Sequence, residues 1–382
     1  MHFTSSPHTT HNQLTNMPGK VLQDACVDCQ SVEASLAIRN RRLCRDCFIK
    51  YVNAKILKRM ESYRFKNNND DTRRKLLLPV SGGISSLVLL QVLESQLQRQ
   101  RSKRTRTAYE LLVLLVDRDL GIDDTLRTRR VTWYQSLQAR FPSLSFASVQ
   151  SLSNVLAFDR VIEDDMKVFG LARLHDESDL DFTRRIVASA ASPTASADLE
   201  EILLNRLIVS WAKQHDCESI LWGHSDSRLA AKALAGVAKG RGGSLPFQIS
   251  DGPSTAGINF NYPLRDLFQP ELSLYASSLP EVFSELVIED DAIPREKVSM
   301  RNTSIDDLLT TYINSQGEKY PSIMANVVRT ASKLRTTESN EATKNCRICL
   351  VQYQADPGEL AGETHLCYAC SRTRHDIRKI GN

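Results

Sequence analysis

The clearest chemical pattern in the sequence is its set of nine cysteines. Eight of them form C-x-x-C pairs, two pairs toward each end of the chain: Cys26, Cys29, Cys44 and Cys47, then Cys346, Cys349, Cys367 and Cys370. Two intervening residues let both thiolates of one turn face a single ion, and a second such turn completes a tetrahedral all-sulfur shell. Because four thiolates leave no open coordination position, we predict two structural four-cysteine zinc sites.

Three alternatives to this interpretation remain open at the level of sequence. An iron–sulfur cluster suits the same spacing, pairs from opposite termini could share an ion, and a C-x-x-C pair could be redox-active. His365, close to Cys367, is expected to lie outside the coordination sphere because four thiolates are already available. Cys217 stands between a predicted helix and a predicted strand, where we expect it to be a small buried hydrophobic side chain.

The composition is typical of a globular protein with more than one domain: 382 residues, 41% hydrophobic and 25% charged. The longest aliphatic run, residues 111–116, is too short to cross a bilayer, and the N-terminus lacks the basic start and apolar stretch of a secretory signal. We therefore expect a cytoplasmic protein that does not contact membranes and whose cysteines stay reduced.

The formal net charge of +4 is unevenly distributed. Residues 39–75 hold thirteen Lys and Arg against four acids, and residues 99–106 hold five and no acid. Clustered positive charge attracts a phosphate backbone, although a solvated helix face has the same composition. Because basic residues flank both cysteine groups, we predict nucleic-acid binding, with these candidate tRNA-binding residues: Arg41, Arg42, Lys55, Lys58, Arg59, Arg372 and Arg374.

Short aliphatic segments alternate with amphipathic ones in the middle of the chain. The predicted strands are 76–80, 111–116, 144–149 and 219–222, and the predicted helices are 51–66, 86–99, 125–140, 199–214 and 227–239. Asp198 and Glu201 have the spacing of a capping box, and residues 183–198 are typical of a surface loop. This alternation predicts an α/β fold with a doubly wound, mainly parallel sheet.

The same patterns predict four regions. Residues 1–23 are expected to be a disordered tail, and 24–66 an N-terminal zinc module with a basic helix. Residues 72–335 are expected to form the α/β domain, and 336–382 a C-terminal zinc module with a basic tail, preceded by a polar linker.

A glycine-rich turn joins the first predicted strand of this domain to its first helix, with the sequence Ser81-Gly82-Gly83-Ile84-Ser85-Ser86. Glycines allow the backbone to approach a ligand closely, and the exposed amides at a helix N-terminus favour negative charge. The turn therefore predicts a phosphate site, with a tight turn that binds nothing as the alternative.

This turn resembles the S-G-G-x-D-S pyrophosphate loop of the ATP pyrophosphatase (PP-loop) family, and residues 223–232 resemble that family's G-H-N-x-D-D-x-x-E-T segment. The resemblance implies an adenine nucleotide alpha hydrolase-like fold and a degenerate nucleotide site made of Ser81, Gly82, Gly83, Ser85, Ser86, Gly223 and His224. Several motif positions differ from the family pattern. Ser85 stands in place of the expected Asp, and Ser225 in place of the Asn. Ser227 and Arg228 replace the paired acids, and Ala231 and Lys232 replace the Glu and the Thr. The resemblance therefore leaves ATP binding open.

Catalytic thiolases of this family also carry a C-x-x-C pair and a further cysteine, but residues 186–194 and 258–267 contain none. Sulfur transfer requires a nucleophilic thiolate, and adenylation requires magnesium held by acids. We therefore predict that the chain has no catalytic residues of its own.

Over residues 24–375 the chain is most similar to the second, degenerate subunits of the cytoplasmic tRNA 2-thiolation heterodimer. The resemblance implies a catalytic partner subunit, tRNA as substrate and a thiocarboxylated ubiquitin-related modifier as sulfur donor. The implied product is 5-methoxycarbonylmethyl-2-thiouridine at the wobble position of tRNAs for Lys, Glu and Gln. Two alternatives are an independently active ATP-dependent tRNA-modifying enzyme with a divergent loop, and a zinc-module regulator that binds nucleic acid.

Overall fold

The computed structural model describes residues 24–65, 74–104, 106–118, 124–287, 303–317, 319–334, 343–354 and 365–378. Its internal contacts divide the chain into two units, Met1–Phe48 and Ile49–Asn382. The tail expected over residues 1–23 lies outside the described residues, as does most of the linker expected over 336–345.

The small unit is built around one β-hairpin. Strands β1 (Leu36–Ile38) and β2 (Arg41–Leu43) pair antiparallel, and Arg39 in the turn adopts a left-handed conformation with φ 53°. Helix α1 (Arg45–Arg59) starts directly after this hairpin, several residues earlier than the helix predicted over 51–66, and is followed by the short 3-10 helix η1 (Glu61–Tyr63). The hairpin thus separates the two C-x-x-C pairs of this unit.

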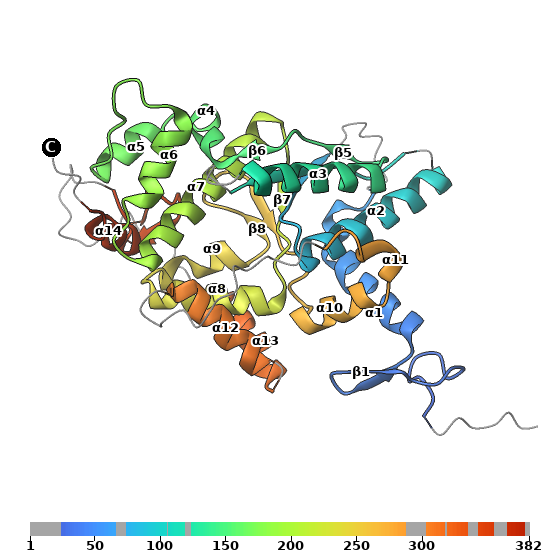
Figure 1. Cartoon of the computed structure of the whole chain (residues 1–382). Coiled ribbons are helices and arrows are strands. Elements are labelled where there is room, and N and C mark those ends of the chain that lie inside the picture. The colour runs from blue at the N-terminus through green and yellow to red at the C-terminus, as the bar shows by residue number, and fades with distance from the viewer. Residues whose placement is uncertain are drawn as a thin grey trace, which may run out of the picture. The chain divides into compact units, whose positions relative to one another are not determined.

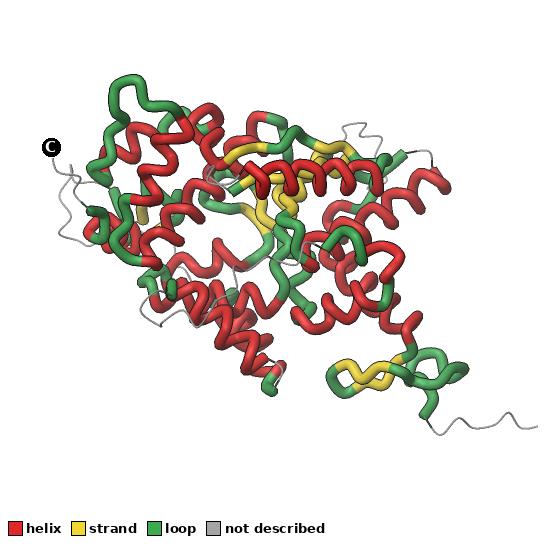
Figure 2. Tube along the Cα trace, in the orientation of Figure 1, coloured by secondary structure: helices red, strands yellow, loops and turns green. Residues whose placement is uncertain are grey.

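A mainly parallel sheet forms the centre of the large unit (Figures 1 and 2). Its strands lie in the order β5-β4-β3-β7-β9-β8, with β6 paired to β4, and among the described strands of this sheet only β8 and β9 pair antiparallel. The bounds are β3 Lys75–Val80, β4 Glu110–Asp117, β5 Ser145–Phe146, β6 Gln150–Ser151, β7 Ser219–Leu221, β8 Gly252–Pro253 and β9 Asn259–Asn261. The fold class is therefore the predicted one.

Both faces of the sheet are buried, as expected for a parallel sheet. In β3, successive residues Leu76, Leu77 and Leu78 point to opposite faces, and all three are fully buried. Leu77 shares one apolar cluster with side chains of the helices α7 and α8, while α2 and α3 pack against β3 and β4. This doubly wound arrangement places the carboxyl ends of β3, β4, β7 and β9 at one edge of the sheet, where ligands bind in open α/β folds.

The helices of the large unit are α2 Ile84–Arg104, α3 Asp124–Arg140, α4 Val155–Phe158, α5 Ile162–Val168, α6 Asp179–Ala188, α7 Pro193–Gln214, α8 Asp226–Ala238, α9 Leu245–Ile249, α10 Gln269–Ser277, α11 Pro280–Phe283, α12 Ile305–Gly317, α13 Pro321–Ala331 and α14 Tyr368–His375. Two short 3-10 helices, η2 Leu152–Asn154 and η3 Gly242–Ser244, complete the unit. None of the helices that the structure describes is long and apolar enough to span a bilayer.

The surface loop predicted over residues 183–198 is wrong, because this segment holds the end of α6 and the first turns of α7. Ser192 caps α7 by accepting a hydrogen bond from the backbone N–H of Ala195, and Pro193 occupies the first turn, where its missing N–H costs nothing. Asp198 is therefore not the cap that the sequence suggested. It lies inside the helix, is 2% exposed, and forms ion pairs with Lys239 and Arg241 at 2.9 and 3.0 Å.

The C-terminal cysteine module is an integral part of the large unit. Strands β10 (Thr343–Asn345) and β11 (Gln352–Gln354) pair antiparallel and flank its first C-x-x-C pair, so a hairpin surrounds that pair. Helix α14 packs beside α7, and the cysteines belong to one buried apolar cluster with side chains of α5, α6 and α7 (Figure 1).

A buried guanidinium fixes this module to α7. Arg206 is 2% exposed and forms ion pairs with Asp159 at 2.6 Å and Asp165 at 2.8 Å. It also donates hydrogen bonds to the backbone carbonyls of Arg347 and Ile348, at 2.9 and 3.2 Å. One side chain thus satisfies two buried carboxylates and two carbonyls of the cysteine knuckle.

Replacing Arg206 by methionine is expected to lower the free energy of unfolding by about 3–5 kcal/mol, because buried Asp159 loses its cation and buried Asp165 keeps only the partly exposed Arg347. The measurement is urea unfolding of the full chain followed by tryptophan fluorescence. The matched control is Arg64→Met, which removes an exposed i,i+3 ion pair with Glu61 and should change stability by less than about 0.5 kcal/mol. Equal effects of the two substitutions would contradict this account.

Candidate functional site

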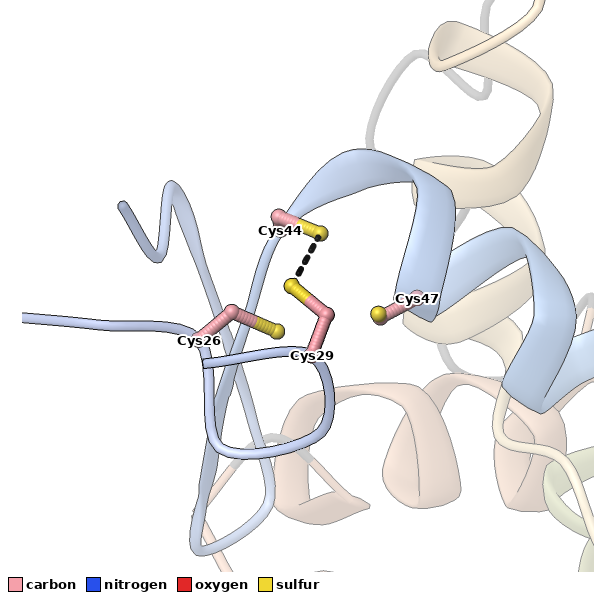
Figure 3. Close-up of side chains that lie close together, drawn as sticks. All are labelled: Cys26, Cys29, Cys44 and Cys47. Atoms are coloured by element: carbon pink, nitrogen blue, oxygen red, sulfur yellow. Dashed lines mark hydrogen bonds between the residues drawn. The ribbon is translucent and has the colours of Figure 1, made fainter. Parts of the chain in front are cut away.

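The four N-terminal cysteine sulfurs converge on one point in the small unit (Figure 3). Their Sγ atoms all lie within 4.8 Å of one another, and those of Cys29 and Cys44 are 3.9 Å apart. Cys26 and Cys29 come from the turn before β1, and Cys44 and Cys47 from the start of α1. Hydrogen bonds from the hydroxyl and the backbone N–H of Ser31 lower the pKa of Cys29 to about 6, which favours the thiolate that a metal ion requires.

The C-terminal sulfurs converge in the same way, again within 4.8 Å of one another, with Cys349 and Cys367 at 3.7 Å. Each group of four forms from cysteines of one terminus, so the alternative in which pairs from opposite termini share an ion is not the arrangement observed. Both groups can hold a metal ion, since four closely spaced sulfurs are the ligand set of structural zinc and of iron–sulfur clusters.

The surroundings of the two groups differ, and this predicts different effects of losing the metal. Replacing Cys346 and Cys349 by serine is expected to destabilise the large unit by about 4 kcal/mol or more, because Cys346 belongs to its buried core. Replacing Cys26 and Cys29 by serine should leave that unfolding transition in place. All three tryptophans lie in the large unit, so their fluorescence on heating reports it alone, with metal content measured on the same samples.

Equal losses of stability in the two double variants would contradict the integral role of the C-terminal group. So would a C-terminal variant that loses its metal and keeps its melting temperature.

The glycine-rich turn lies at the carboxyl edge of the sheet, between β3 and α2. Gly82 has a positive φ of 85°, and the hydroxyl of Ser86 donates to the carbonyl of Gly83 at 2.9 Å. Gly223, at the end of β7, packs directly on the same turn: a Cβ there would lie 3.2 Å from the Cα of Ser86. The structure therefore brings the predicted residues 81–86 and 223 together, and glycine at 223 permits the close approach.

The motif positions where the family pattern has acids hold no acid here, since Ser85, Ser227 and Ala231 are neutral and Arg228 is a cation. The Ser85 hydroxyl, in place of the loop Asp, donates to the side-chain carbonyl of Gln269 at 2.9 Å. Ser225 also reaches that oxygen, at 3.5 Å, and the backbone N–H of Gln269 donates to Ser227 at 3.2 Å. Hydroxyl and amide groups are far weaker ligands for magnesium than carboxylates.

Gln269 is a site residue that sequence reasoning missed. It opens α10, and β9, the strand shortly before it, was not predicted. The only local signal for that strand is the alternation of apolar Ile258, Phe260 and Tyr262 with two asparagines.

A cavity of about 100 Å³ is lined by Trp222 and His224, the two neighbours of Gly223 in sequence. It is lined by the ends of β7 and β9, by α7 and α8, and by the first C-terminal cysteine knuckle. At its rim Lys232 pairs with Glu201 at 2.6 Å, with the two side chains 21% and 37% exposed. Lys232 stands where the family motif has Thr. Its positive charge is neutralised by Glu201 of α7.

His224 lines the cavity and is uncharged near neutral pH. Burial holds the pKa of His224 well below its usual range, and the nearby cations Lys232 and Arg228 act in the same direction. Its ring stacks between Trp222 and Tyr262, with ring centres 5.7 and 5.8 Å away. The motif histidine therefore takes part in an aromatic stack.

The low pKa of His224 predicts a loss of stability in acid. As the pH falls below about 6.5, the unfolded chain takes up a proton that folded His224 excludes, so unfolding becomes more favourable. The free energy of unfolding should drop by up to about 1.4 kcal/mol between pH 7.5 and 5.5 from this residue. Urea unfolding of His224→Phe should show a shallower pH dependence by that amount, whereas the exposed His175→Gln should match the parent chain.

The candidate tRNA-binding residues occupy different surroundings. Arg59 is engaged by Asp266 at 2.6 and 2.8 Å, and Arg372 lies 3.5 Å from buried Asp198. Lys58 and Arg374 are exposed, and Lys55 is half-buried over the ring of Tyr51. In the small unit, Arg41 and Arg42 form ion pairs with Asp28 and Asp24.

Two further sequence expectations concern single residues. Cys217 is 8% exposed and belongs to the core beneath β7, where burial raises the pKa of its thiol to about 11. It is therefore the small buried hydrophobic side chain expected from the sequence. His365 is exposed and lies outside the four-sulfur group, with its backbone carbonyl accepting a hydrogen bond from the N–H of Arg347.

Comparison with known proteins places these features in a family. The family model described as cytoplasmic tRNA 2-thiolation protein 2 matches residues 304–365. A protein of that name from Aspergillus oryzae is 43% identical over 94% of this chain and 99% of its own length, and one from Aspergillus clavatus is 42% identical over 94% and 100%. The chain belongs to the cytoplasmic tRNA 2-thiolation protein 2 family.

The resemblance drawn from the S-G-G turn and the residues after β7 is thereby confirmed, and the family has a role in tRNA 2-thiolation. The family name includes the cytoplasmic location that the sequence led us to expect. Among solved structures, the U34-tRNA thiolase NcsA from Methanococcus maripaludis with its [4Fe-4S] cluster has a TM-score of 0.58 at 16% identity. That match covers 94% of this chain and 99% of the thiolase, and it shows a shared PP-loop fold.

Proposed function

We propose that this chain is the non-catalytic, tRNA-binding subunit of a cytoplasmic tRNA 2-thiolation heterodimer. Its partner is a catalytic subunit of the same fold that carries the loop Asp and the sulfur-transferring cysteines. The complex acts on the wobble uridine of tRNAs for Lys, Glu and Gln, already bearing the methoxycarbonylmethyl group, with sulfur from a thiocarboxylated ubiquitin-related modifier.

The observation that carries the non-catalytic role is the neutral network around the loop. Ser85, Ser225 and Ser227 share Gln269, so the positions where the motif would bind magnesium hold no carboxylate. Adenylation needs a divalent cation to neutralise the triphosphate, and sulfur transfer needs a thiolate. The described free cysteines are the two groups of four and buried Cys217, whose raised pKa disfavours the thiolate.

The two cysteine groups are proposed to hold structural zinc, because four clustered thiols form a closed tetrahedral set. We propose the α/β domain over residues 72–335, with cysteine modules over 24–66 and 336–382, as the parts that hold tRNA. Lys58 and Arg374 are exposed candidate contacts, as are Arg41 and Arg42, which form ion pairs with Asp28 and Asp24.

The tRNA-binding role predicts a charge-dependent affinity. Reversing Lys58 and Arg374 to glutamate is expected to weaken tRNA binding by about tenfold near 0.1 M salt and to reduce the salt slope by about 2. Filter binding at several salt concentrations measures both quantities. The matched control is Lys333→Glu, at an exposed position just after α13, which should change neither the affinity nor the salt slope.

The role in the complex is tested in cells that lack this chain, by measuring 2-thiouridine in total tRNA after reintroducing variants. Ser85→Ala should restore thiolation, because the loop performs no chemistry in this subunit. ATP–pyrophosphate exchange by the isolated chain with magnesium and tRNA would overturn the non-catalytic role and favour an independent ATP-dependent enzyme.

A further inference from the structure

The cavity lined by Trp222 and His224 is larger than a site for one structural water. Its volume is about 100 Å³, whereas a single water needs only about 10–15 Å³. Two of its lining residues, Lys232 and Glu201, have side chains that are 21% and 37% exposed, so the lining is partly open to solvent.

Two buried polar atoms of the lining have no hydrogen-bond partner among the residues that the structure describes. They are the Nε1 of Trp222 and the Nδ1 of His224, on neighbouring stacked rings. Trp222 is only 9% exposed, and a buried N–H without a partner costs about 1–3 kcal/mol. Such groups in an apolar cavity point to a ligand that satisfies them.

The charges around the cavity are already neutralised by one another. Lys232 pairs with Glu201, and Lys239 pairs with Asp198 and Asp306 at 2.9 and 2.7 Å. Arg241 and Arg206 also line the cavity, and they pair with Asp198 at 3.0 Å and with Asp159 and Asp165 at 2.6 and 2.8 Å. Because these cations already have carboxylate partners, the cavity favours a neutral ligand over an anion.

The walls beside the two free atoms are aromatic. Tyr262 continues the stack begun by Trp222 and His224, and Phe260 packs edge-on against Trp222 with ring centres 5.6 Å apart. Flat apolar faces favour a planar ring system.

The polar edge of that ring system follows from the two free atoms. Trp222 Nε1 can only donate a hydrogen bond, and neutral His224 accepts at Nδ1 when its other nitrogen carries the proton. We propose that this cavity binds a neutral nucleobase whose edge carries a carbonyl next to an N–H, as uracil does. The base comes either from a free nucleoside or from an unstacked position of an RNA strand. The proposed thiolation role requires no base pocket in this chain, so the two can fail separately.

Calorimetric titration of the full chain with uridine, adenosine and N3-methyluridine tests this assignment. Uridine should bind, and N3-methyluridine, which lacks the N–H, should bind at least about tenfold more weakly, as should adenosine. A second arm uses a short oligouridylate and the same strand with N3-methyluridine at its centre, at fixed salt. Binding in the strand arm alone identifies RNA as the source of the base.

Trp222→Phe and His224→Phe keep an aromatic ring and remove one polar atom each, so each should weaken binding about tenfold. Trp211→Phe is the matched control, because Trp211 is buried but stacks on His215, outside the cavity lining. Melting temperatures confirm that the variants fold. If neither uridine nor the strand binds, or if the Trp222 and His224 variants bind like the parent chain, the cavity holds only water and the inference is wrong.

Discussion

The buried ion pairs of α7 are the interaction on which the rest of the large unit depends. Arg206 and Asp198 project from this one helix to the C-terminal knuckle, to the end of α8 and to α12 through Lys239. Charges this deeply buried tolerate little displacement, because each would lose its partner in a medium that solvates ions poorly. The helix therefore fixes the distance between the sheet edge and the cysteine module, and the cavity between them keeps its shape.

The loop has the backbone of an anion site without the charges of a catalytic one. The turn between β3 and α2 still exposes Ser81 and Gly83 at a helix N-terminus. At the motif positions for acids, Ser85 and Ser227 carry hydroxyls that are bonded to Gln269, and Arg228 carries a positive charge. Losing these acids removes the ligands for a metal–triphosphate complex, although buried Asp226 remains at the start of α8.

Much of this was predictable from local patterns. Aliphatic runs at 76–80 and 111–116 predicted the central strands, because buried parallel strands need apolar side chains on both faces. The segment 183–198 misled because small and polar residues are typical of loops, yet here Ser192 and Pro193 start a helix whose polar Asp198 is paired with cations 41 and 43 residues away. Such pairs depend on tertiary packing, as do Gln269 and the cavity, and no local pattern carries that information.

Gly223 shows that a motif residue can be retained in a chain that has lost other residues of the motif. The backbone after β7 approaches α2 so closely at this point that a Cβ on residue 223 would lie 3.2 Å from the Cα of Ser86, a tighter contact than most Cβ atoms make. His224 likewise fills a place in an aromatic stack. Both are needed to assemble the sheet edge whether or not a nucleotide is ever activated there. In divergent members of such folds, the motif residues that are retained therefore indicate a shared architecture. The motif residues that are replaced indicate which chemistry has been lost.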